Sequence, residues 1–398
     1  METRCLVSRQ PVFDSNVSVA AYELRSHLIV DQTDMSAEDV ARAALSPFTR
    51  AALDEILGNE LGIITLTPAA LAGGLWQGIP SDRIVLGYFE QFNTSDETAE
   101  RVSRLVAEGY RLALSDKLPH ATMDHFAKLA QFIRVDVTRY TPDDLQKRAL
   151  ELRCHKASLF AENVVTYDDL EFSRSLAFDL YQGQFLCKMA RPTSDLSLNR
   201  LAMIRVVSKL QDPELKMADL EKLISQDVAL SYRLLRYINS FAVALRSEIT
   251  SVGHAVRMVG IERLKTWTAA LLLAAVDDKP RELTTVALVR ARMCERLAEA
   301  VNSRQKESFF FAGLLSVLEA LLDCPMETAL ADLSLSDGIR KALIEQSGPM
   351  GEAVRCAIAY EQPDWGGVQF QGLSLAQIRD SYLEAISWAT QLQSELHV

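Results

Sequence analysis

The sequence predicts an α/β domain, built on a parallel sheet or a closed barrel, followed by an all-helical domain. Short apolar runs alternate with helical stretches through residues 1–190, the composition changes at residues 188–199, and helical periodicity alone follows that change. The apolar runs lie at residues 17–21, 63–66, 84–88, 111–114, 132–135, 158–161 and 181–186.

Each apolar run has the length of a buried strand, and the stretch after it leaves room for a helix. Parallel strands separated by helices bring their carboxyl ends to one edge or face, where functional sites of such folds lie. The polar residues at these ends are therefore the candidates for a functional site. They include Glu23, Thr65, Ser115, Asp116, Asp136, Glu162 and Gln182, while Gly87 stands at one further end.

The segment 188–199 (KMARPTSDLSLN) predicts the boundary between the domains, because Pro192 is followed by small polar residues typical of a turn. We expect a first domain at residues 1–190, a linker at 191–199 and a helical domain at 200–398. In the helical domain, apolar residues recur at the i, i+3, i+4 spacing of a buried helix face. Asp227 and Ser251 are predicted to cap helix starts, and Gly260 to end a helix.

Composition excludes several classes of protein. No apolar stretch approaches the roughly 20 residues that span a bilayer, and the N-terminus METRCLVSRQ is unlike a secretory signal, which predicts a cytoplasmic protein. A net charge of −11 argues against nucleic acid or an anionic membrane as partner. Six dispersed cysteines without a CxxC pair predict reduced, mostly buried thiols.

Read in order, the strand-end residues resemble those of the EAL domain, a bacterial module that hydrolyses cyclic di-GMP with divalent metals in a barrel. Residues 9–14 (RQPVFD) are similar to its first strand, and residues 21–27 (AYELRSH) to its signature segment. The resemblance implies a TIM-barrel-like fold, trimmed between Asp136 and Glu162, with Glu23 at the signature glutamate. The further positions that match the family are Asp116, Asp136, Glu162 and Gln182.

The resemblance fails at several positions that hold metal in active members of the family. Thr65 replaces an Asn, Gly87 a Glu, Ser115 an Asp, Val165 a Glu, and Arg134 a catalytic-site Lys. A two-metal site needs several carboxylates converging on one pocket, and a guanidinium stays protonated where a lysine can be tuned. We therefore expect no catalytic residue, no bound metal and no cofactor. The surviving acids are equally compatible with a structural role, as acceptors for loop amides or partners of Arg134.

The helical half resembles the HDOD domain, a relative of HD-type metal-dependent phosphohydrolases that lacks their His-Asp signature. The resemblance rests on residues 220–240, 249–264 and 309–322. Ser316 and Val317 stand where a hydrolase of that type has its His-Asp pair, so this half lacks the donors for such a metal site.

Together the two halves resemble the EAL-HDOD class of bacterial signalling proteins. The prediction is a non-catalytic regulatory scaffold in cyclic di-GMP or two-component-linked signalling, not an enzyme, which binds other signalling proteins and forms a possible homodimer. Two alternatives stay open. One is a residual metal-dependent cyclic di-GMP phosphodiesterase that uses Glu23, Asp116, Asp136 and Glu162; the other is a sensor that binds cyclic di-GMP without hydrolysis.

Overall fold

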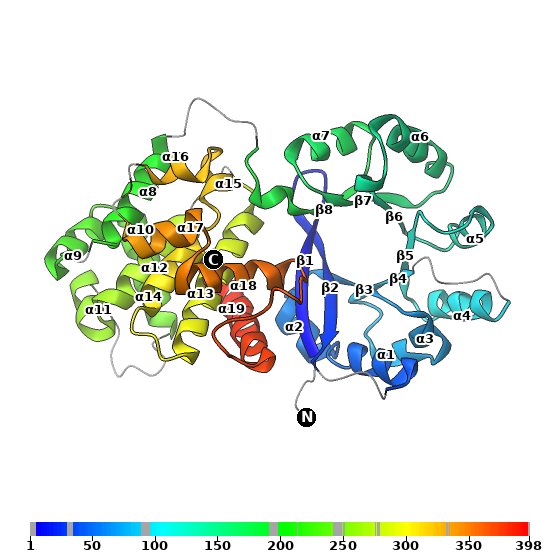
Figure 1. Ribbon diagram of the computed structural model, residues 1–398, viewed down its shortest axis with the longest axis horizontal. Helices are drawn as coiled ribbons and strands as arrows, with labels where there is room; N and C mark the ends of the chain where they lie inside the picture. The colour runs from blue at the N-terminus through cyan, green and yellow to red at the C-terminus, as the bar shows by residue number, and fades with distance from the viewer. Residues whose placement is uncertain are drawn as a thin grey trace. The chain divides into compact units, whose positions relative to one another are not determined.

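The computed structural model describes residues 5–29, 35–88, 96–190 and 198–396, except residues 213, 242–248, 250, 275, 277, 278, 332 and 334. The chain divides into two compact units (Figure 1). One comprises Met1–Ala190 with Tyr360–Trp365, and the other Arg191–Ala359 with Gly366–Val398. The predicted linker falls largely outside the described residues, so its exact bounds stay a prediction.

Eight strands of the described part close into a barrel in chain order, β1 to β8 (Figure 1). Their bounds are β1 (Cys5–Phe13), β2 (Val19–Leu28), β3 (Leu61–Thr65), β4 (Ile84–Tyr88), β5 (Arg111–Ser115), β6 (Phe132–Asp136), β7 (Ser158–Val164) and β8 (Leu180–Gly183). This confirms the predicted barrel, and the predicted run at 84–88 coincides with β4.

The first strand departs from the predicted parallel arrangement. β1 pairs antiparallel with β2 and with β8, whereas all pairs from β2 to β8 are parallel. The predicted run at 17–21 is also misplaced, because Val17 has a φ of 58° in the turn between β1 and β2. The short connection explains the direction, since a tight turn can join only antiparallel strands.

Helices on the outside of the strands complete the barrel unit (Figure 1). Several begin at a Ser or Thr whose side-chain oxygen accepts a hydrogen bond from the first helical turn, as in α2, α6 and α7. Each cap involves only neighbouring residues and determines where its helix begins. The helices are α1 (Ala37–Leu45), α2 (Arg50–Leu57), α3 (Pro68–Ala72), η1 (Leu75–Gly78), α4 (Asp96–Ala107), α5 (His120–Phe126), η2 (Val137–Arg139), α6 (Pro142–Leu152), α7 (Tyr167–Ser175) and η3 (Gln184–Cys187).

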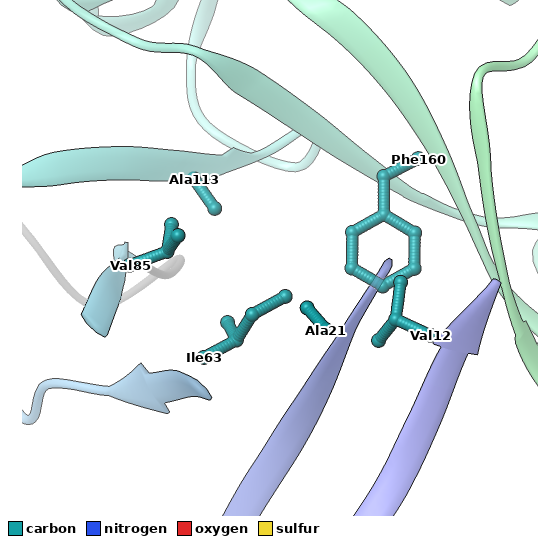
Figure 2. Packing of buried hydrophobic residues seen from close by; sticks show 6 residues of the cluster. All are labelled: Val12, Ala21, Ile63, Val85, Ala113 and Phe160. Atoms are coloured by element: carbon teal, nitrogen blue, oxygen red, sulfur yellow. The ribbon is translucent and has the colours of Figure 1, made fainter. Parts of the chain in front are cut away.

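An apolar layer fills the inside of the barrel. It consists of Val12, Ala21, Ile63, Val85, Ala113 and Phe160, drawn in Figure 2, with Leu61, Phe132 and Leu180 packed against it. Because these residues come from every strand, the barrel is closed by a packed core, and any site must lie above this layer, toward the strand ends.

The second unit is helical, as predicted. Its helices are α8 (Leu198–Leu210), α9 (Met217–Ser225), α10 (Val228–Phe241), α11 (Val252–Val259), α12 (Ile261–Ala274), α13 (Arg281–Ala300), α14 (Lys306–Leu315), α15 (Leu318–Leu322), α16 (Met326–Leu330), α17 (Asp337–Ile344), α18 (Gly348–Glu361) and α19 (Leu375–Leu396). The predicted caps are confirmed: Asp227 accepts from the Leu230 amide at 2.9 Å, Ser251 accepts from the His254 amide at 3.1 Å, and Gly260 ends α11 with a φ of 87°.

Two further expectations concern the whole chain. All six cysteines are free, but half of them are buried (Cys5, Cys294 and Cys356), fewer than predicted. Within the described ranges, none of the helices combines the length and the apolar character that crossing a membrane requires.

Gly313 sets how closely α14 approaches α13. A Cβ at this position would lie 2.5 Å from the Arg290 carbonyl oxygen and 2.7 Å from the Ala291 Cα, so neither backbone could stay in place. We expect Gly313→Ala to lower the free energy of unfolding by about 1–3 kcal/mol, the usual cost of overpacking, in urea denaturation. Gly338→Ala is the matched control, because its Cβ would meet only the Met350 side chain, at 3.6 Å. Equal stability of the two variants would contradict this account of the helix contact.

Candidate functional site

A ring of polar positions lies directly above the apolar layer. Side chains of a strand alternate between its two faces, so a residue two positions from a core residue also faces the inside of the barrel. On β2 to β8 these positions come after the core residue, and on the antiparallel β1 Gln10 precedes Val12. We call this ring the polar layer; it comprises Gln10, Glu23, Thr65, Gly87, Ser115, Arg134, Glu162 and Gln182.

Arg134 joins two acids of the polar layer that come from different strands, Glu23 of β2 and Glu162 of β7. Its side chain has no solvent exposure, and its Nη2 donates to Glu23 Oε1 at 2.7 Å. Its Nε donates to Glu162 Oε1 at 2.7 Å, and Nη2 also bonds to this oxygen. The guanidinium carbon lies 5.2 Å from the centre of the Phe160 ring, in the apolar layer below. Arg134 therefore links β6 to both β2 and β7.

Glu23 receives donors on both carboxylate oxygens. Besides Arg134, the Nη2 of Arg25 lies 3.1 Å from Oε1. Gln182 donates through Nε2 to Oε2 at 3.3 Å, and the same nitrogen donates to Gln10 Oε1 at 2.8 Å. Glu23 is thus the hub of a network that spans β1, β2, β6 and β8.

The charges in this network are set by burial and by the two arginines. Burial opposes the ionisation of Glu23, but Arg134 and Arg25 together hold its pKa below the ordinary value. Burial also disfavours the charged form of Arg134, yet the neighbouring Glu23 and Glu162 raise its pKa, so the guanidinium stays protonated. The pKa of Glu162 lies above its ordinary value, because burial and the nearby Glu23 charge raise it more than the attraction of Arg134 lowers it.

Asp116 lies apart from the polar layer. It is the first residue beyond β5, and the charged side chains that act on it are Arg148, Lys117 and Asp136, not Glu23 or Arg134. Asp116 Oδ2 accepts a hydrogen bond from the Tyr140 hydroxyl at 2.5 Å, and Arg148 Nη2 donates to the Asp116 carbonyl oxygen at 2.6 Å. Burial raises the pKa of Asp116, and burial together with this acid raises the pKa of Tyr140 to about 12. These contacts tie α6 to the end of β5.

Asp136 is held at the end of β6, two residues beyond Arg134. Its Oδ1 accepts from the Thr138 amide at 3.3 Å and hydroxyl at 2.7 Å, and Arg139 Nε lies 3.2 Å from its Oδ2. Burial raises the pKa of Asp136, but hydrogen bonds from Thr138 and Asn163 outweigh it and leave the pKa below its ordinary value. The structure therefore brings Glu23, Glu162 and Gln182 together and leaves Asp116 and Asp136 outside this network.

The positions that depart from the EAL pattern supply few ligands for a metal. Thr65 is exposed, Gly87 is buried without a side chain, and Ser115 offers a neutral hydroxyl. Val165 lies just beyond β7 and is 40% exposed. Within the described ranges no three His, Cys, Asp or Glu side chains are grouped to hold a metal ion. The residues present thus do not fit the two divalent ions that the resemblance implies, because Arg134 already binds both acids of the layer.

Sequence reasoning missed four contributors to this site. Gln10 stands two residues before a core residue of the first strand, a spacing that could have placed it in the polar layer. Arg25 lies within the signature segment two residues after Glu23, but the sequence does not predict its ion pair with Glu23. Tyr140 and Arg148 reach Asp116 from a loop and a helix, and no local pattern marks them.

Known proteins resemble this chain in sequence along almost its whole length. The model of the HDOD domain matches residues 199–331. A Vibrio cholerae protein named cyclic di-GMP phosphodiesterase CdgJ is 27% identical over 403 residues, which cover 97% of this chain and 92% of that protein. The uncharacterized protein YuxH of Bacillus subtilis is 24% identical over 405 residues, with 98% and 99% covered.

Solved structures with EAL domains are also neighbours of this chain. An EAL domain protein from Listeria monocytogenes has a TM-score of 0.38 at 12% identity, and the match covers 46% of this chain and 87% of that one. The PaMucR phosphodiesterase in complex with c-di-GMP has a TM-score of 0.40 at 14% identity, with 45% and 94% covered.

These comparisons correct the functional prediction. The expectation of a non-catalytic scaffold that is not an enzyme is contradicted by the nearly end-to-end match to a protein named cyclic di-GMP phosphodiesterase. The predicted fold class is confirmed, with a barrel in the first half and a helical second half that contains an HDOD domain. The strand-end residues and the sequence matches together support an EAL-like barrel followed by an HDOD domain.

Proposed function

We propose that this chain is a cyclic di-GMP phosphodiesterase whose barrel acts at the carboxyl ends of its strands. The observation that carries the proposal is the match to CdgJ over 97% of this chain and 92% of that protein. Such a match spans both units in the same order, so it relates whole proteins and not a single shared module.

The layer above Glu23 and Arg134 holds the two residues that suit this reaction. Arg25 lies two residues beyond Glu23 on β2, and Asp136 two residues beyond Arg134 on β6, so they occupy opposite sides of the barrel. The Arg25 side chain is 47% exposed and oriented by Glu23, which suits a cation that binds a phosphodiester oxygen. Asp136 keeps a carboxylate partly open to solvent, which suits a base that takes a proton from the attacking water.

In this scheme water attacks one phosphorus of the cyclic dinucleotide, and its proton passes to the Asp136 carboxylate. The bond from phosphorus to the 3′ oxygen breaks, the released 3′ oxygen takes a proton from solvent water, and the ring opens to a linear dinucleotide. Arg25 stabilises the charge that builds on the phosphate oxygens. Asp116 and Tyr140 hold the end of β5 and take no part in the proton transfer.

The test is hydrolysis by the purified full chain, with Mg²⁺, with Mn²⁺ and with chelator, followed by chromatography of the linear dinucleotide. We expect product from the wild type and a loss of about 10²-fold or more in rate for Asp136→Asn, the usual contribution of a general base. Asn at this position can still accept the Thr138 hydrogen bonds. Asp143→Asn, at an exposed position in the first turn of α6, is the matched control. Absence of product from folded wild type would overturn the proposal.

A second function, binding of cyclic di-GMP without hydrolysis, is favoured by the ion pairs of Arg134 with Glu23 and Glu162. These pairs occupy the acids that a metal-dependent hydrolase would need free. Calorimetry on the same protein separates the two functions. Heat of binding without product supports a receptor, and product formation supports the phosphodiesterase.

A further inference from the structure

We propose that Arg134 is a built-in cation of the barrel, which takes the place between Glu23 and Glu162 that a divalent ion would need. The polar layer is then complete without metal, and the wild-type chain loads no divalent ion there. This inference rests on the proposed phosphodiesterase function and deepens it. If both hold, hydrolysis proceeds without a metal ion in the polar layer.

The guanidinium of Arg134 is buried between the two acids that it binds. Arg134 is fully buried, and its donors reach Glu23 at 2.7 Å and Glu162 at 2.7 Å from one planar group. A planar guanidinium with several fixed donors satisfies two carboxylates at once and does not lose its charge at neutral pH. It therefore keeps the two acids neutralised at neutral pH. A lysine in the same place could lose its proton on burial and has no planar set of donors.

Few oxygen ligands for a metal surround the two acids. Hard divalent ions take six or more oxygen ligands. At other positions of the polar layer Gly87 offers no side chain, Ser115 offers a neutral hydroxyl, and Gln182 turns a donor nitrogen toward Glu23. An ion entering the layer would find both carboxylates already bound and would meet the positive charge of Arg134.

The charges of the network also balance. Arg25 adds a second positive charge 3.1 Å from Glu23, so the two arginines balance the two glutamates. A site with balanced charge has little residual negative potential to attract a cation. Removal of Arg134 alone would restore that potential, because the two glutamates would then face each other with only Arg25 to offset them.

The test uses the full chain and Mn²⁺ alone, with binding followed by the electron paramagnetic resonance signal of free Mn²⁺ and stability followed by thermal denaturation. We expect the wild type to show no Mn²⁺ binding that depends on Glu23 and no change of Tm on addition of chelator. Arg134→Gln should bind Mn²⁺ with a Kd at least about tenfold lower than that of any residual, Glu23-independent binding to the wild type, and its Tm should rise with Mn²⁺. Arg134→Gln combined with Glu23→Gln and Glu162→Gln should lose both responses.

If Arg134→Gln does not fold, Arg134→Lys still tests the inference. Lysine retains the charge but loses the planar fork, so we expect a lower Tm than the wild type and still no Mn²⁺ binding. Wild-type binding of Mn²⁺ that Glu23→Gln abolishes would overturn the inference, as would an Arg134→Gln protein that folds and ignores Mn²⁺. These readouts do not depend on hydrolysis. A wild type that neither binds Mn²⁺ nor forms product would therefore contradict the phosphodiesterase proposal alone.

Discussion

Replacing Arg134 with alanine is expected to lower the free energy of unfolding of the barrel by about 3–5 kcal/mol, the cost of leaving a buried ion pair without one partner. Glu23 has 1% of its side chain exposed and Glu162 has 13%, so neither carboxylate can regain full hydration when the guanidinium is removed. Hydrogen exchange followed by mass spectrometry measures this loss in the full chain. Peptides from β2, β6 and β7 should exchange faster, and those from α13 should not change.

Two further variants test the physical reason for this loss. Arg42→Ala removes an ion pair with Glu38 in which both side chains are more than half exposed, and surface pairs of this kind contribute about 0–1 kcal/mol. Arg134→Met combined with Glu23→Gln and Glu162→Gln removes all three buried charges and should recover most of the lost stability. If Arg134→Ala and Arg42→Ala destabilise the protein equally, the network does not hold the barrel together.

Replacing Lys279 with alanine is expected to lower the stability of the helical unit by about 3 kcal/mol, again as the cost of a broken buried pair. Lys279 Nζ donates to both carboxylate oxygens of Asp323 at 2.7 Å, and each side chain is only 8% exposed. Asp323 has a φ of 54° at the end of α15, so this pair also holds a left-handed residue in place. Exchange should rise in α15 and leave the barrel peptides unchanged.

Arg50→Ala is the control for the second pair. Arg50 binds Asp82 through two hydrogen bonds, but both side chains are more than half exposed, so water replaces the lost partner. We expect no measurable change of stability in this variant. A Lys279→Ala protein that behaves in the same way would show that burial does not determine the strength of these ion pairs.

Local signals in the sequence predicted the elements well where hydrogen bonds are local. Asp227 and Ser251 each accept from an amide three residues ahead, so the cap can be read from neighbouring residues. The pairing of β1 with β8 could not be predicted from its residues, because it joins Phe13 to Tyr181 across most of the barrel unit. Strand propensity does not specify which distant strand becomes a neighbour.

The members of the candidate site could be predicted in part, but their contacts could not. The order of strand-end residues identified Glu23, Arg134 and Glu162 as positions of one scaffold. One structural role that the sequence allows for the surviving acids is pairing with Arg134, and the structure pairs it with Glu23 and Glu162. Asp116 lies outside this network because it follows the end of β5 and accepts a hydrogen bond from Tyr140 in a later loop.

Taken by itself, the sequence determined a barrel followed by helices, the positions at the strand ends and the replacement of several carboxylates. Those features depend on residue type and on periodicity within one segment. Only the tertiary structure decided that Arg134 and Glu23, 111 residues apart, share one buried ion pair while Asp116 turns elsewhere. The physical reason is that closure of the barrel brings strands from opposite sides around one small interior, where unpaired charges are not tolerated.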